Sequence, residues 1–204
     1  MTLHVVRCDE VAPQPWKNGG GVTRELLAWP ARQPGAASAA PAPKDDWALR
    51  LSVADITADG PFSAYPGVDR WFAVLQGEGV RLQLATGARE VRAGQAPLTF
   101  GGEDAPGCTL LHGATRDLNL RLRRGAGQGA MRLARTAEDF APRTGLRALF
   151  AVVALRLRAG AKAFDLPAFA LAWSDDSANE SWCLDGMGAP APLAYWMHFD
   201  PGAA

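Results

Sequence analysis

The stretch that decides the fold is residues 47–53 (WALRLSV), in which large apolar residues alternate with small or polar ones. Successive side chains of a β-strand point to opposite faces of the sheet, so this period of two places Trp47, Leu49, Leu51 and Val53 on one face. The stretch therefore predicts a strand with one face buried in a core.

Similar short segments extend from this stretch toward both ends of the chain, separated by glycine, proline and acidic turns. Residues 22–29 also have apolar residues at helical spacing, but their β-branched start and the stop at Pro30 favour a strand. Residues 138–140 predict a helical turn, and no long amphipathic helix is apparent. The other predicted strands are residues 5–8, 70–76, 80–84, 89–92, 98–100, 109–111, 117–123, 147–157, 161–166, 169–173 and 193–199.

About a dozen short strands at this spacing predict an all-β sandwich or barrel. The pattern before about residue 128 resumes after about residue 145, which predicts a first half at residues 1–128 and a smaller second half at 129–204 packed against it. Residues 30–46 (PARQPGAASAAPAPKDD) hold almost no large apolar residue. They cannot bury enough surface to order themselves, so we expect a mobile loop and assign it no function.

The totals exclude several classes of protein. Lys+Arg and Asp+Glu both number 21, whereas nucleic-acid binders carry a basic excess. The three cysteines are far apart without a C-x-x-C pair, which favours a reducing compartment. The N-terminus lacks signal-peptide features, and no apolar run reaches the 18 residues of a membrane span. We therefore expect a cytoplasmic protein of 204 residues that binds neither nucleic acid nor membranes.

Residues 15–25 (PWKNGGGVTRE) are the first candidate for chemistry. Three consecutive glycines suit a sharp turn or a close approach to the backbone, and successive N–H groups in such a turn can form a nest that favours anions. Lys17 and Arg24 would strengthen that preference. The alternative is a tight turn with charged flanks, since neither phosphate-loop spacing is present.

Two further groups of polar residues follow. Residues 60–70 (GPFSAYPGVDR) offer the hydroxyls of Ser63 and Tyr65 with an Asp69-Arg70 pair, and could equally be a loop cross-linked by that pair. Asp117-x-Asn119-x-Arg121 shares one strand face, which is solvated outside a sandwich but a polar pocket wall inside a barrel. The pattern leaves both alternatives open.

Metal and nucleophile motifs are missing from the sequence. Its three histidines form neither an H-x-H nor an H-x-x-x-H pair, and zinc needs three or four protein ligands. There is no G-x-S-x-G motif. We therefore expect no metal, no cofactor and no catalytic residue.

These blocks, in this order, resemble the HutD/Ves family. PWKNGGGVTREL is the family's most recognisable stretch, and GPFS with PGVDR and Asp117-x-Asn119 resemble its later blocks. The resemblance implies a cupin-type double-stranded β-helix (jelly roll) in a two-barrel, or bicupin, arrangement. Ser63, Tyr65 and Arg70 stand roughly where metal cupins carry ligands, and a cation at a ligand position repels a metal and invites an anion.

The family is associated with histidine utilisation, whose intermediates carry carboxylates. The resemblance thus implies a regulator, or governor, of amino-acid catabolism that binds a small carboxylate metabolite such as formylglutamate or urocanate. The alternatives are a metal-independent isomerase, lyase or hydrolase and a protein-interaction module, and a homodimer stays open. The expected ligand-binding residues are Trp16, Lys17, Asn18, Gly19, Gly20, Arg24, Ser63, Tyr65, Asp69, Arg70, Asp117 and Asn119.

Overall fold

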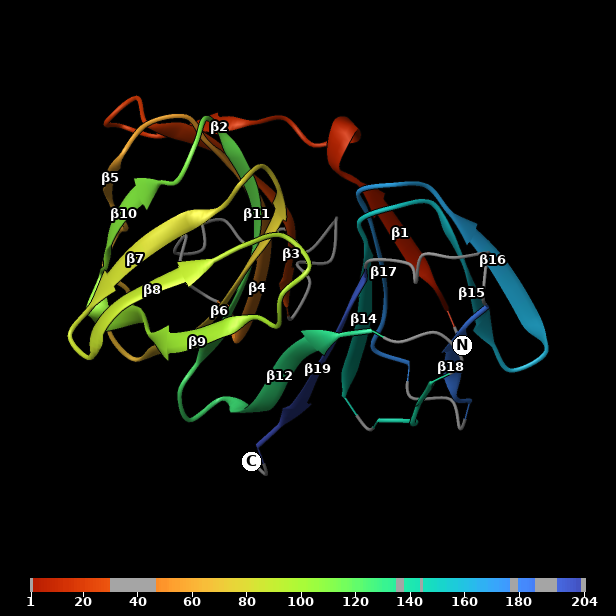
Figure 1. Cartoon of the computed structure of the whole chain (residues 1–204). Coiled ribbons are helices and arrows are strands. Elements are labelled where there is room, and N and C mark those ends of the chain that lie inside the picture. Colours follow the sequence, from red (N-terminus) through yellow and green to blue (C-terminus); the bar gives the residue numbers. More distant parts are fainter. Residues whose placement is uncertain are drawn as a thin grey trace, which may run out of the picture.

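Nearly all regular structure in the chain is β-strand, as the alternating pattern predicted (Figure 1). The computed structural model describes residues 2–29, 47–134, 138–143, 145–176, 180–185 and 194–202. Two short 3-10 turns, η1 (Cys8–Glu10) and η2 (Gly102–Asp104), are the helical elements in these residues, and none of the described helices could span a membrane. The expected loop at 30–46 lies outside the described residues.

Two sheets build the first half and pack face to face (Figure 1). The six-stranded sheet has the order β2 (Gln14–Pro15), β3 (Gly21–Trp29), β4 (Leu49–Ile56), β11 (Thr115–Arg123), β6 (Val68–Gln76) and β9 (Leu98–Gly101). The four-stranded sheet has the order β5 (Gly60–Pro61), β10 (Gly107–Leu110), β7 (Val80–Leu84) and β8 (Gly87–Val91).

Two more sheets build the second half. The five-stranded sheet has the order β1 (His4–Arg7), β17 (Ala170–Ser174), β14 (Leu146–Ala151), β19 (Ala194–Pro201) and β12 (Gly127–Leu133). The four-stranded sheet has the order β13 (Asp139–Phe140), β18 (Trp182–Leu184), β15 (Leu155–Ala159) and β16 (Lys162–Leu166). The division at residue 128 stays a prediction. The N-terminal strand β1 belongs to a sheet of the second half, because it pairs with β17.

Two local predictions were wrong. Residues 139–140 form a strand that pairs with β18, because Phe140 is buried and stacks on Trp196, which favours an extended segment over a helical turn. Residues 147–157 form two strands in different sheets, β14 and β15, joined by a turn. The apolar run hid that turn, since β14 is buried on both faces and no polar residue marks its end.

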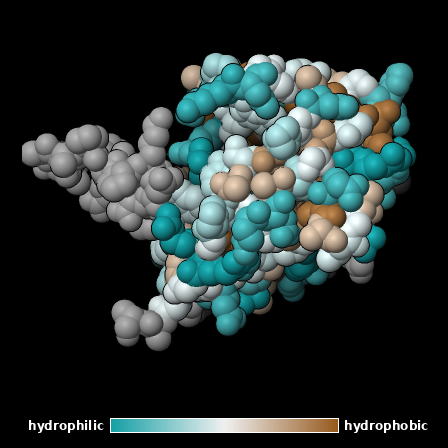
Figure 2. All heavy atoms as spheres, turned by 90° about the vertical axis from the view of Figure 1, so that its left-hand side faces the viewer, coloured by the Kyte–Doolittle hydropathy of each residue, from teal (hydrophilic) through white to brown (hydrophobic). Residues whose placement is uncertain are grey.

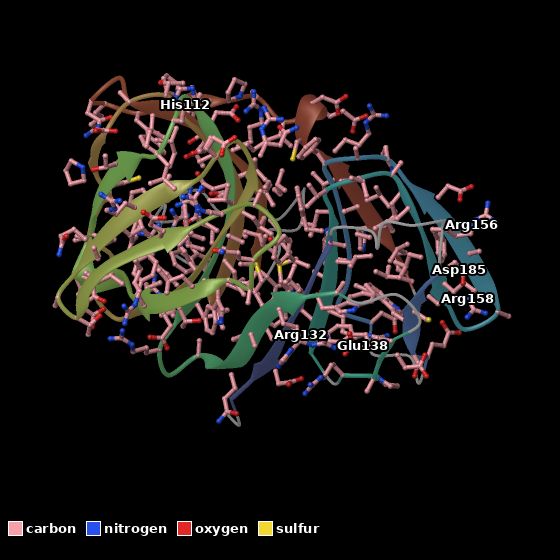
Figure 3. The ribbon with its side chains drawn as sticks, in the orientation of Figure 1. His112, Arg132, Glu138, Arg156, Arg158 and Asp185 are labelled. Carbon is pink, nitrogen blue, oxygen red and sulfur yellow. The ribbon has the colours of Figure 1, made fainter. Side chains whose placement is uncertain are left out.

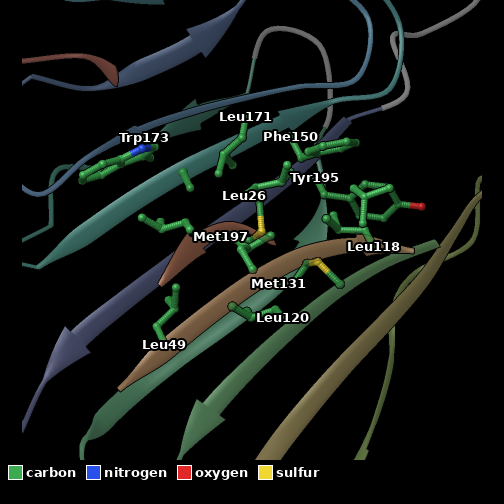
Figure 4. Packing of buried hydrophobic residues seen from close by; sticks show 14 of the residues in the cluster. Leu26, Leu49, Leu118, Leu120, Met131, Phe150, Leu171, Trp173, Tyr195 and Met197 are labelled. Atoms are coloured by element: carbon green, nitrogen blue, oxygen red, sulfur yellow. The ribbon is translucent and has the colours of Figure 1, made fainter. Parts of the chain in front are cut away.

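The largest core lies between the two halves (Figure 4). Leu49 and Leu51 of β4 and Leu120 of β11 meet Leu171 and Met197 there, and the two strands are buried along this face. The alternating stretch that predicts the fold therefore turns its leucines toward the second half. Trp47 precedes β4 and is buried beneath the Arg123 guanidinium, 5.4 Å from its ring centre.

Candidate functional site

A cavity of about 540 Å³ lies in the first half. Its wall combines the inward faces of β3, β4, β6 and β11 with the turn before β3 and the loop before β6. The lining residues are Gln14, Pro15, Trp16, Lys17, Asn18, Thr23, Arg50, Ala54, Ile56, Pro61, Phe62, Ser63, Tyr65, Arg70, Asp117, Asn119 and Arg121.

The strand alternation places polar side chains in this cavity. On β11, Leu118 and Leu120 point into the core between the halves, so Asp117, Asn119 and Arg121 point the other way, into the cavity. The sequence left open whether this polar face lies outside a sandwich or inside a barrel. In the structure this polar face points inward and lines the cavity.

The glycine run is the turn that joins β2 to β3. Trp16 N donates to Gly21 O at 2.9 Å, and the Trp16 indole donates to the Thr23 hydroxyl at 2.7 Å. Gly19 has a φ of +71°, a conformation that glycine adopts without strain. At Gly21 a Cβ would lie 2.3 Å from the Asp55 carbonyl oxygen, so the turn can close against β4 only with glycine there.

The predicted anion nest does not form in this turn. Gly19 N donates to Trp16 O at 3.0 Å, and Gly20 N donates to Asn18 Oδ1 at 3.1 Å. Both N–H groups are therefore used within the turn, and neither glycine lines the cavity. The run contributes the neighbouring Trp16, Lys17 and Asn18 to the wall instead.

Arg70 on β6 is the central cation of the site. Its side chain is 2% exposed and lies among aromatic rings, 4.9 Å from the centre of Phe62 and 5.0 Å from that of Phe100. Nη2 donates to Asn119 Oδ1 at 2.7 Å, whereas Nε and Nη1 are buried and have no hydrogen-bond partner in the part of the chain that the structure describes. Unpaired buried donors are costly, so these two N–H groups favour an acceptor within the cavity.

A short hydrogen-bonded chain continues from Arg70 along β11. Because the Asn119 oxygen accepts from Arg70, the Asn119 amide nitrogen faces Asp117 and donates to its Oδ1. Asp117 Oδ2 is buried and has no hydrogen-bond partner in the described ranges. Arg121 donates to the Ser52 hydroxyl at 3.1 Å and lies 4.8 Å from the centre of the Tyr65 ring.

The site carries more buried positive charge than its neighbours balance. Within the described part of the chain, no carboxylate lies within ion-pair distance of Arg70 or Arg121. Burial, and then the charge of Arg121, lower the pKa of Arg70 to about 9, and burial likewise lowers the pKa of Arg121. Burial raises the pKa of Asp117 to about 8, although both arginines oppose that rise. A bound anion would relieve the repulsion between the two arginines.

Most of the predicted ligand-binding residues meet in this one cavity. Those that line it are Trp16, Lys17, Asn18, Ser63, Tyr65, Arg70, Asp117 and Asn119. The residues just before the glycine run and Arg70 thus face a common space, although they are far apart in the sequence. Gly19, Gly20, Arg24 and Asp69 lie outside its wall.

Asp69 and Arg24 differ from their predicted places for the same physical reason. Neighbouring residues of a strand point to opposite faces. Asp69 therefore points away from Arg70 and accepts from Arg124 at 2.7 Å, instead of holding Arg70 as expected. Arg24 likewise points away from Thr23 and the cavity, and forms an ion pair with Asp55 at 2.7 Å.

Sequence reasoning missed several lining residues, of which Arg121 and Arg50 matter most. Arg121 stands in the Asp117-x-Asn119-x-Arg121 pattern but was not among the expected binding residues. Arg50 occupies a polar position of the alternating stretch at 47–53, and it pairs with Glu25 at 2.5 Å. The sequence does show which strand face each arginine occupies. That face identifies them as cavity residues only once it is known to point inward.

No group of three or more His, Cys, Asp or Glu side chains in the described ranges is placed to hold a metal ion. His112 lies in the connection from β10 to β11, at one end of the first half (Figure 3). On the face turned to the viewer in Figure 2, hydrophilic residues predominate and the hydrophobic residues form small separate areas. The inward-facing cavity therefore stands out as the candidate site.

The packed sheets and the cavity inside them define a cupin-like all-β protein. A family model described as HutD matches residues 8–189, and the chain belongs to this family.

Known relatives agree with this assignment. The chain is 37% identical over 118 residues to an uncharacterized 21.2 kDa protein in the hutC 3′ region of Pseudomonas putida, an alignment that covers 58% of this chain and 57% of that protein. It is 34% identical over 134 residues to protein Ves of Citrobacter koseri, which covers 64% of each. The alignments thus span about three fifths of these two relatives.

The solved structure of HutD from Pseudomonas fluorescens superposes with a TM-score of 0.81 at 23% identity, covering 99% of this chain and all of that one. At this identity the similarity establishes the fold alone.

Proposed function

We propose that the first half binds a small carboxylate metabolite in its cavity. The observation that carries this proposal is the Arg70 guanidinium, which is 2% exposed and, among the residues that the structure describes, has no carboxylate partner and no hydrogen-bond partner for Nε and Nη1. An arginine fork matches the geometry of a carboxylate. The anion would therefore supply both the missing charge and the missing acceptors.

The other wall residues would orient this anion. Lys17 at the turn adds a further cation beside the arginines, and the hydroxyls of Ser63 and Tyr65 add donors. Trp16 and Phe62 supply apolar surface for the carbon skeleton of the ligand. A cavity of about 540 Å³ is in the usual size range of small-molecule sites.

The setting of the family supports a more specific proposal for the ligand. A relative in Pseudomonas putida is described by its place in the hutC 3′ region, which associates this family with a histidine-utilisation locus. We therefore propose that the ligand is a histidine-degradation intermediate, such as formylglutamate or urocanate, and that its binding regulates amino-acid catabolism.

Isothermal titration of the purified protein with formylglutamate and with urocanate tests this proposal. Loss of one charge-assisted hydrogen bond costs about 1.5–3 kcal/mol, so Arg70→Gln should weaken binding about 10- to 100-fold. Arg81→Gln is the matched control, because Arg81 is an exposed arginine of the same half, on β7, paired with Glu90. The proposal fails if no carboxylate binds the wild type, or if the two variants bind equally well.

A further inference from the structure

Among the described residues, Asp117 is the one carboxyl group that lines the cavity, and its surroundings give it an unusual role. The residue is 1% exposed, and Oδ1 accepts from the Asn119 amide. Oδ2 is buried and has no hydrogen-bond partner among the described residues. No arginine or lysine forms an ion pair with it there, so an ionised Asp117 would be a buried charge without direct compensation.

The hydrogen-bonded chain fixes where a proton on Asp117 would reside. The Asn119 oxygen is occupied by Arg70, so the Asn119 amide N–H must face Asp117. That amide already donates to Oδ1, which leaves Oδ2 as the oxygen that can carry the proton. A carboxylic acid kept neutral by its apolar surroundings can act as a hydrogen-bond donor at a binding site.

Building on the proposed carboxylate site, we infer that the anion binds to the form of the cavity in which Asp117 carries a proton on Oδ2. Asp117 is then a specificity-determining residue. In its neutral form it leaves the positive charge of Arg70 and Arg121 available to the anion, whereas in its ionised form it would repel the anion and neutralise part of that charge.

The charged and titratable groups around Asp117 come from each neighbouring strand. They are Arg70 on β6, Arg121 on β11, Asp55 on β4 and Cys108 on β10. Asp55 already pairs with Arg24 and Arg116, and burial raises the pKa of Cys108 to about 12, so this thiol stays neutral. Lys17, Arg50 and Tyr65 complete the titratable part of the wall. The pKa of Asp117, at about 8, thus lies nearer to neutral pH than that of Arg70, at about 9.

The consequence is that carboxylate binding and proton binding assist each other. An anion in the cavity makes ionisation of Asp117 less favourable, so the complex retains a proton that the free site begins to lose as pH rises. With the free-state pKa at about 8, the affinity should fall about tenfold between pH 7 and pH 9. The same linkage predicts net proton uptake on binding near pH 8.

Titration calorimetry at pH 7, 8 and 9 tests the inference, with formylglutamate as the probe and Asp117→Asn as the variant. Asparagine is nearly isosteric, always neutral, and still offers an oxygen to Asn119 and an N–H in place of the acid proton. The affinity of the variant should fall by no more than about twofold from pH 7 to pH 9, which is the loss expected from Arg70 with its pKa of about 9. Binding at pH 8 in two buffers of different ionisation enthalpy should show clear proton uptake by wild type and little by the variant.

The outcomes separate this inference from the proposed function. If wild type binds no carboxylate at any pH, the proposed function fails, and this inference fails with it. If wild type binds but shows no proton uptake and no loss of affinity at pH 9, the inference alone is overturned. It is also overturned if Asp117→Asn still loses about tenfold in affinity between pH 7 and pH 9, because the proton would then belong to another group such as Arg70. The buffer comparison on wild type holds even if the variant folds poorly.

Discussion

Each half of the molecule holds an almost fully buried arginine on an interior strand of a sheet, Arg70 on β6 and Arg147 on β14. Both side chains are almost fully buried, and both lie against aromatic rings, Arg147 at 4.8 Å from the centre of Trp182. Their other neighbours differ. Arg147 donates to the Glu180 carbonyl at 2.6 Å and lies at the edge of an apolar interior. Arg70 instead lines a cavity and is hydrogen-bonded to Asn119, which in turn donates to Asp117.

The difference teaches how one strand pattern can serve two purposes. In the second half, Trp196, Trp182 and Phe140 occupy the interior together with leucines and alanines, so burial of apolar area stabilises this part. In the first half, the corresponding inward positions of β4 and β11 hold polar and charged side chains around a cavity. Groups of that kind are retained at binding sites although they lower stability.

The largest expected effect comes from emptying the apolar interior. Trp196 is fully buried and stacks on Phe140 with ring centres 4.7 Å apart. Trp196→Ala should lower the free energy of unfolding by about 3–5 kcal/mol, because it loses buried area and leaves a cavity. Urea unfolding followed by circular dichroism measures this change. Trp16→Ala is the comparison variant in the first half. If it lowers the free energy of unfolding as much as Trp196→Ala does, the proposed difference between the two halves is wrong.

A smaller effect is expected from replacing the two arginines by methionine. Arg70→Met removes a buried charge without an ionic partner but leaves the Asn119 oxygen unpaired, so the free energy of unfolding should change by less than about 1 kcal/mol. Arg147→Met loses a hydrogen bond to the Glu180 carbonyl and should cost about 1 kcal/mol. Carboxylate binding should disappear in Arg70→Met and persist in Arg147→Met. Equal binding by both variants would show that the arginines are equivalent.

The sequence predicted the fold well because its strand period is regular. Leu49 and Leu51 mark a buried face by alternation alone, and the glycine and proline turns mark where strands end. The pattern failed at residues 147–157, where both faces of β14 are buried and the period of two disappears. A period of two shows that the two faces of a strand differ in polarity, but it does not show which face points into a barrel.

The residue blocks indicated most of the side chains of the candidate site, but the blocks alone could not show that these side chains meet in one cavity. Arg70 and Asp117 reach one cavity because β6 and β11 are hydrogen-bonded neighbours, a pairing between distant segments that no local pattern specifies. Strand alternation explains why Asp69 was misplaced, since neighbouring residues of a strand point to opposite faces. Arg50 was missed because a single polar residue within an apolar strand is most simply interpreted as solvent-exposed.

On the outside of the second half, ion pairs such as Arg132–Glu138 and Arg158–Asp185 lie near the surface and contribute little to its stability (Figure 3). His198 is a different case, because it is partly buried on β19 near Phe140. Burial, and then the charge of Arg143, lower the pKa of His198 below its usual value. The folded state therefore binds this proton more weakly than the unfolded state does.

This shift gives the smallest effect, and its sign is opposite to that of Asp117. A depressed histidine pKa stabilises the fold above about pH 6.5, and that stability is lost as pH falls toward the folded-state pKa. The raised pKa of Asp117 stabilises the fold at low pH, and that contribution is lost as pH rises toward about 8. Between pH 7.5 and pH 5, His198 should thus destabilise the acidified protein by less than about 1 kcal/mol, while Asp117 works in the other direction.

Comparing His198→Gln with wild type at pH 7.5, 6 and 5 isolates the histidine contribution, because Asp117 is present in both proteins and cancels. The free energy of unfolding from urea titrations should fall less on acidification in His198→Gln than in wild type. Asp117→Asn should have the reverse effect, with its largest gain over wild type near pH 8 and little gain near pH 4. If His198→Gln and wild type keep a constant difference across this range, the histidine does not titrate differently in the folded state. The pH dependence of the second half would then resemble that of an ordinary solvated surface, and the contrast in sign between the two halves would rest on Asp117 alone.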